Sequence, residues 1–162
     1  MDFQVSKVQK KILKHYGWAR GNISVRIKIF HQPTKKTMDA ELWKLSAAKM
    51  AIGIRNRQFS SEEVVTSVKQ RIAKLNPLLN AIVGDGGENA LEEAKKADQA
   101  VEKGKILGPL HGVPVTIKSN VDVKGQPTSN GLPVYADFIA EDDSPVVSNL
   151  KKAGAIIIGR TN

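Results

Sequence analysis

The chain has 162 residues, of which 41% are apolar and 25% charged, so it can bury the core of one ordinary domain. It contains no cysteine, which excludes disulfides, thiolate zinc sites and a cysteine nucleophile, and leaves nothing to favour an oxidising compartment. No stretch reaches the ~18 consecutive apolar residues that a membrane-spanning helix needs. We therefore expect a cytoplasmic protein without a membrane partner.

The formal net charge of +9 is concentrated at the N-terminus. Residues 1–37 hold nine of the 25 basic residues but one of the 16 acidic residues, so residues 38–162 are nearly neutral. The basic segment could contact nucleic-acid phosphates, act as a mitochondrial presequence, or be an extension from a start codon assigned too early. We expect residues 1–37 to be an extension outside the native domain. A nucleic-acid partner is expected only if this segment is genuine.

Helices are predicted in the first part of residues 38–162. Asp39 is suited to cap a helix whose apolar face includes Trp43, Ala47 and Ile54. A second helix should begin at the capping box of Ser60 and Glu63 and end at Asn76-Pro77. A third, over about residues 88–103, should end at Gly104.

Strands are predicted later in the chain. Val113–Ile117 and Ala155–Ile158 are short apolar runs that are typical of buried strands. Between them, Ser144-Pro145 is an N-cap followed by a proline, which predicts another helix. Strands that alternate with helices predict an α/β fold whose sheet is covered on both faces.

Common catalytic motifs are missing, and the sequence predicts neither a metal site nor a cofactor. It contains no G-x-S-x-G, H-E-x-x-H, G-x-G-x-x-G or phosphate-binding loop. His15 and His31 lie in the basic segment, and His111 lies in a Gly/Pro-rich stretch. A lone histidine of this kind is more often a turn residue bonded to backbone than a catalyst.

Lys118 is the candidate catalytic residue, because it directly follows the predicted strand 113–117. Ligands of open α/β sheets bind at the carboxyl ends of strands. A lysine held among apolar groups there has its charged form disfavoured and can act as a base. The alternative is a lysine that extends into water, as most lysines at strand ends do.

Several motifs occur together in order after residue 106. They are Gly-Pro-Leu-His-Gly-Val-Pro (108–114), Lys118, Asp-Ser-Pro-Val-Val (143–147) and Ala-Gly-Ala-Ile-Ile-Ile-Gly-Arg-Thr-Asn (153–162). With the two helices before them, they make residues 38–162 resemble the N-terminal part of the amidase signature family. The resemblance implies an α/β/α sandwich with a mixed sheet, preceded by helices.

The resemblance also implies an activity, the hydrolysis of a carboxylic amide C–N bond by a Ser–cis-Ser–Lys triad without a cofactor. Lys118 stands at the position of the family's lysine base. The Gly/Ser-rich signature that carries both serines would follow Thr161-Asn162. We therefore expect residues 38–162 to be a truncated portion of the domain that lacks the nucleophile and is inactive alone.

Two departures from the family affect the substrate side of this expected site. Ser119 stands where an Asp is frequent, and Leu132 replaces a small hydroxyl residue. Thr128, Ser129 and Gly131 are the candidate substrate-binding residues, for a small-molecule amide that the sequence does not name. The sequence also leaves the oligomeric state open. Two alternatives remain: a non-catalytic truncated remnant, and a component of a transfer-RNA-dependent amidotransferase.

Overall fold

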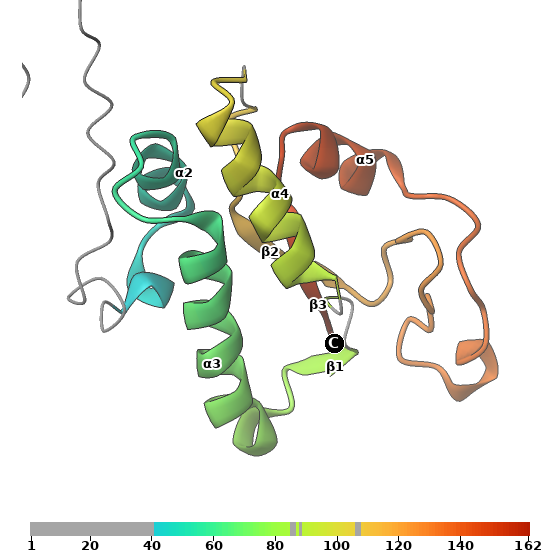
Figure 1. Cartoon of the computed structure of the whole chain (residues 1–162). Helices are drawn as coiled ribbons and strands as arrows, with labels where there is room; N and C mark the ends of the chain where they lie inside the picture. The colour runs from blue at the N-terminus through green and yellow to red at the C-terminus, as the bar shows by residue number, and fades with distance from the viewer. Residues whose placement is uncertain (1–40, 85–86, 88, 106–107) are drawn as a thin grey trace, which may run out of the picture. The chain divides into compact units, whose positions relative to one another are not determined.

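The computed structural model describes residues 41–84, 87, 89–105 and 108–162. The predicted extension 1–37, the boundary before Met38 and the cap at Asp39 lie outside these residues. In chain order the elements are η1 (Leu42–Lys44), α2 (Ala47–Arg55), α3 (Ser61–Leu79), β1 (Ile82–Gly84), α4 (Ala90–Glu102), β2 (Pro114–Lys118), η2 (Pro133–Tyr135), α5 (Pro145–Lys152) and β3 (Ile156–Thr161) (Figure 1).

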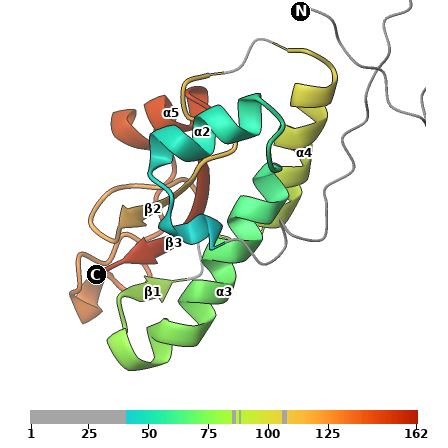
Figure 2. The ribbon, with the colours of Figure 1, turned by 90° about the vertical axis from the view of Figure 1, so that its left-hand side faces the viewer.

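A three-stranded mixed sheet lies at the centre of this part of the chain, in the order β1-β3-β2. Strand β2 is parallel to β3, and β1 is antiparallel to β3. Helices α3 and α4 lie side by side in Figures 1 and 2 and bury Ile156 and Ile158 on one face of the sheet. Val147 of α5 packs against Ile117 and Ile157 on the other face. The predicted α/β class with a mixed sheet is confirmed.

The pairing of β2 with β3 contains a bulge. Val115 lies opposite Ile157, but the next residue, Thr116, lies opposite Gly159. Ile158 and Gly159 of β3 therefore share one partner residue on β2. A bulge of this kind reverses which face the following side chains point to.

The start of the first helix was predicted wrongly. Trp43 belongs to the short 3-10 helix η1, whereas α2 begins only at Ala47. Leu45 between them has an extended backbone, and the Ser46 side chain accepts a hydrogen bond from Lys49 N as the N-cap of α2. A serine cap thus replaces the helical turn that the apolar spacing of Trp43 and Ala47 predicted.

The end of α3 was also predicted wrongly, because the helix continues through Pro77 to Leu79. Asn80 then ends it in the left-handed conformation, with its N–H bonded to the carbonyl of Asn76. The Asn76 side chain bonds both the N–H and the C=O of Ile82, at 2.8 and 2.9 Å. These bonds fix the start of β1, a strand that the sequence did not predict.

The second predicted strand was too short, because β3 continues past Ile158 to Thr161. The remaining helix ends follow the sequence signals. Ser60 and Glu63 form the capping box of α3, and Ser144 caps α5 with Pro145 in its first turn. Gly104 and Gly154 follow α4 and α5 with φ of 65° and 90°. Within the described ranges, no helix is long and apolar enough to cross a membrane.

Candidate active site

Lys118 lies at the carboxyl end of β2, beside the end of β3. Its Cα is paired with that of Thr161, and Ser119 N donates a 2.7 Å hydrogen bond to Thr161 O. Because the two strands are parallel, their carboxyl ends meet at one edge of the sheet. This is the edge where open α/β sheets bind ligands.

The side chain of Lys118 is exposed, so the described part of the chain does not bury its ammonium group among apolar residues, and the expected burial stays a prediction. Successive side chains of a strand point to opposite faces of the sheet, and the side chain of the preceding residue, Ile117, is buried against α5. Lys118 therefore points to the other face of the sheet, where α3 and α4 cover Ile156 and Ile158 of the central strand. Strand β2 lies at the edge of the sheet, and this cover does not bury Lys118.

Arg160 is a buried charged residue of this region for which the sequence indicated no function. Its side chain is only 4% exposed. Its Nη2 donates to Val121 O at 2.8 Å and to Lys118 O at 3.3 Å, and its Nη1 donates to Gln126 Oε1 at 3.3 Å. Burial lowers the pKa of the guanidinium, and the nearby charge of Asp122 partly offsets this.

The loop that follows Lys118 is also fixed at its far end. Asp143 accepts hydrogen bonds from Lys124 N at 2.9 Å and from Lys151 Nζ at 2.7 and 2.9 Å. Partial burial by itself would raise the pKa of Asp143, but the bonds from Lys151 and Lys124 lower it below its ordinary value. Ser144 N donates to Asp122 O, so the loop is tied to the start of α5.

The predicted substrate-binding residues lie further along this connection. Thr128 N donates to Phe138 O, and Thr128 Oγ1 is buried without a hydrogen-bond partner in the described ranges. Ser129 accepts from Gly131 N through its Oγ at 3.4 Å, and Gly131 has a φ of 74°. No hydrogen bond between described residues joins these three residues to Lys118. The role of Thr128, Ser129 and Gly131 in substrate binding stays a prediction.

His111 has the structural contact expected of a turn residue. Its Nε2 lies 2.9 Å from Ala97 O of α4, which ties the turn before β2 to that helix.

Comparison with known proteins identifies the family. The profile of the Amidase family matches residues 63–162. The chain is 50% identical over 121 residues to an indoleacetamide hydrolase of Bradyrhizobium diazoefficiens, covering 75% of this chain and 23% of that protein. It is 39% identical over 122 residues to a glutamyl-tRNA(Gln) amidotransferase subunit of Natranaerobius thermophilus, covering 75% and 25%. The chain belongs to the amidase signature family.

A solved structure of the family agrees with this assignment. The peptide amidase of Stenotrophomonas maltophilia superposes with a TM-score of 0.67 at 30% identity, over 74% of this chain and 25% of that one. The chain spans about a quarter of the length of the curated relatives it matches.

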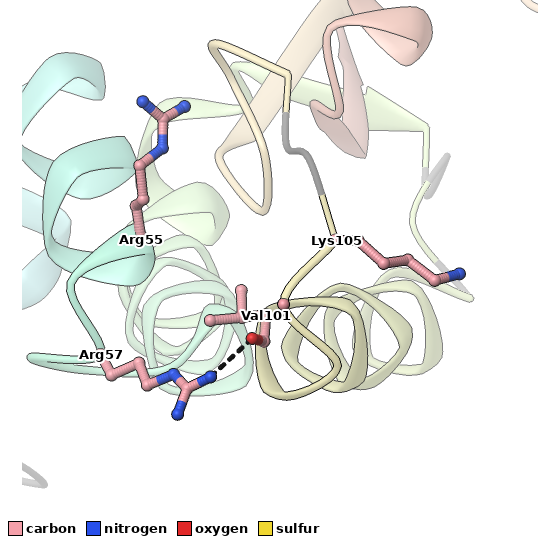
Figure 3. A pocket seen from close by; sticks show the side chains of 5 residues that line it. Arg55, Arg57, Val101 and Lys105 are labelled. Carbon is pink, nitrogen blue, oxygen red and sulfur yellow. Dashed lines mark hydrogen bonds between the residues drawn. The ribbon is translucent and has the colours of Figure 1, made fainter. Parts of the chain in front are cut away.

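A shallow depression between the ends of α2 and α4 is separate from the residues that the amidase resemblance singles out (Figure 3). It is lined by Arg55, Arg57, Val101, Gly104 and Lys105. Arg57 Nη2 donates to Val101 O at 2.7 Å, and Arg55 Nη2 to Gly108 O at 3.2 Å. Both arginines thus bind carbonyl groups of the fold. In the ranges that the structure describes, no group of three or more His, Cys, Asp or Glu could hold a metal ion.

Proposed function

We propose that this chain supplies the base of an amide hydrolase, in which Lys118 completes a Ser–cis-Ser–Lys triad. The observation that carries the proposal is the position of Lys118 at the carboxyl end of β2, with its neighbour Ser119 bonded to Thr161 and its side chain exposed. In the described ranges, Lys118 Nζ makes no hydrogen bond or ion pair. The amine is therefore accessible to groups from another segment.

In the proposed reaction, neutral Lys118 accepts a proton from the bridging serine, which accepts the proton of the nucleophilic serine. The freed oxygen attacks the amide carbonyl, and ammonia or an amine leaves with a proton returned along the same path. Water then hydrolyses the acyl-enzyme. Burial of Lys118 beneath the segment that carries the serines would disfavour its charged form.

Both serines of the proposed triad would come from a Gly/Ser-rich segment outside these 162 residues. The purified chain should therefore hydrolyse amides and esters no faster than buffer does. If the chain alone instead hydrolyses an amide, and Lys118→Ala abolishes this activity, a serine within these residues acts as the nucleophile.

The test joins residues 1–162 to the part of the B. diazoefficiens indoleacetamide hydrolase that follows its matched region. Indoleacetamide is the first substrate to assay, because this relative is named for it and is 50% identical. Lys118→Ala should lower kcat by about 10²- to 10⁴-fold, the usual contribution of a positioned base. Lys124→Ala is the matched control, because the Lys124 side chain is 66% exposed and forms its ion pair with Asp142 at the surface, so this variant should keep its activity.

If the joined enzyme is folded but hydrolyses no amide, the non-catalytic remnant is favoured.

A transfer-RNA-dependent amidotransferase is the second candidate function, favoured by the 39% identity to the N. thermophilus protein. It predicts binding of transfer RNA that weakens with salt, since lysine contacts to phosphate release counterions. Loss of that binding on deletion of residues 1–37 would assign it to the basic segment.

A further inference from the structure

Arg160 carries a charge in an apolar part of the sheet. Moving a cation out of water costs several kcal/mol unless hydrogen bonds compensate it. Arg160 is 4% exposed, and its Nε has no hydrogen-bond partner in the described ranges. An apolar residue of similar size would avoid this cost. Hydrophobic packing therefore does not explain why an arginine occupies this position.

The bulge in β3 determines where the guanidinium points. Ile156 and Ile158 face α3 and α4, and simple alternation would place Arg160 with them. Because Ile158 and Gly159 share one partner on β2, Arg160 instead lies opposite Ile117. It therefore points to the face of α5 and of the loop that follows Lys118. Bulges often redirect a side chain in this way beside a functional site.

The guanidinium binds both ends of the turn that begins at Lys118. The carbonyl of Lys118 accepts Val121 N at 3.0 Å, which closes the turn. Arg160 Nη2 donates to that same carbonyl and to Val121 O, while Nη1 reaches the side chain of Gln126. A planar guanidinium holds several acceptors in fixed directions, which a lysine ammonium does less well.

We infer that Arg160 is a positioning residue, whose guanidinium fixes the Lys118–Val121 turn and thereby the point from which the Lys118 side chain starts. This inference rests on the proposed function of Lys118 as a base. Arg160 itself would touch neither substrate nor serine. Its effect would be on geometry, to which catalysis is sensitive, since a 1 Å displacement can cost about 100-fold in rate.

The first test uses the 162-residue chain and amide hydrogen exchange. Arg160→Met removes all the donors at similar length, and Arg160→Lys keeps the charge with one donor group. The reporter is Val121 N–H, and the reference is Ile156 N–H, which donates to Val113 O in the same sheet. In Arg160→Met, Val121 should lose at least about tenfold in protection while Ile156 changes less than about twofold. Arg160→Lys should retain part of the protection.

Equal loss of protection at both amides would mean that Arg160 only stabilises the fold, and no loss at Val121 would mean that it does not hold the turn. Either result overturns the inference.

The second test uses the joined enzyme described above. Arg160→Met should lower kcat by roughly 10- to 100-fold with KM little changed, and Arg160→Lys should recover part of the loss. Unchanged kcat in the folded variant would overturn the inference. If the unsubstituted joined enzyme is inactive, the proposed function fails, and the link from Arg160 to catalysis fails with it. The hydrogen-exchange measurement still decides whether Arg160 holds the turn.

Discussion

The carboxylate of Asp98 on α4 binds the first turn of α3. Its two oxygens accept hydrogen bonds from Ser61 N at 2.7 Å and from Glu62 N at 3.1 Å. Burial raises the pKa of Asp98, although these two bonds act in the opposite direction. The contact connects α3 and α4, the helices that cover one face of the sheet.

Asp98→Ala should destabilise the fold, because it leaves two helix N-terminal donors without this acceptor. We expect the free energy of unfolding to fall by about 1 kcal/mol. The loss is this small because the variant no longer buries a carboxylate, and this gain offsets part of the two lost hydrogen bonds. Urea unfolding at pH 7 measures it. Asp142→Ala is the control, because the Asp142 side chain is 87% exposed. Equal midpoints for the two variants would contradict the role given to Asp98.

Asp143→Asn should lower stability in a pH-dependent way. The pKa of Asp143 is below its ordinary 3.8 in the folded chain, so its contribution is present above 3.8 and is lost as pH falls through the folded value. At pH 7 we expect a loss of about 1 kcal/mol, kept small because Lys151 is partly exposed. The gap between variant and parent should close as unfolding is measured at increasingly acidic pH. A gap independent of pH would mean that the carboxylate charge is not what stabilises this loop.

Gly112→Ala and Gly125→Ala should separate steric overlap from backbone strain. Both glycines have a φ of 75°, which costs an alanine about 1–2 kcal/mol. A Cβ on Gly112 would lie 2.0 Å from Ser61 Oγ, whereas Gly125 has no atom within 4 Å of that position. Thermal unfolding should show Gly112→Ala to be the less stable by a further ~1–3 kcal/mol. Equal unfolding temperatures would contradict the close packing of Ser61 against Gly112.

The parts of the fold that the sequence predicted are those set by local chemistry. The serine caps of α3 and α5 and the glycines after α4 and α5 act within a few residues of chain. Strand β1 could not be predicted in this way, because it has three residues and is fixed by Asn76 and by pairing with β3.

The candidate site shows the same limit. The position of Lys118 at a strand end could be predicted from the apolar run before it, and the family resemblance gave it a role. The exposure of the Lys118 side chain could not be predicted, because it depends on which strand lies at the edge of the sheet. The contacts of Arg160 could not be predicted either, since they require the bulge at Ile158 and Gly159 and the folding of a distant loop onto β3.

Deletion of residues 1–37 should leave the unfolding of residues 38–162 unchanged, if this segment is an extension outside the native domain. Thermal unfolding of the two forms measures this directly. A loss of more than about 1 kcal/mol in the shortened chain would show that the basic segment stabilises the domain.

The measurement that most directly tests the central claim is kcat of the joined enzyme with Lys118→Arg. An arginine keeps the positive charge but stays protonated at any working pH, so it cannot accept the serine proton. We predict that Lys118→Arg is as inactive as Lys118→Ala, while Lys124→Arg keeps its activity. Substantial turnover by folded Lys118→Arg would show that this position needs only a positive charge, and would contradict the assignment of Lys118 as the base.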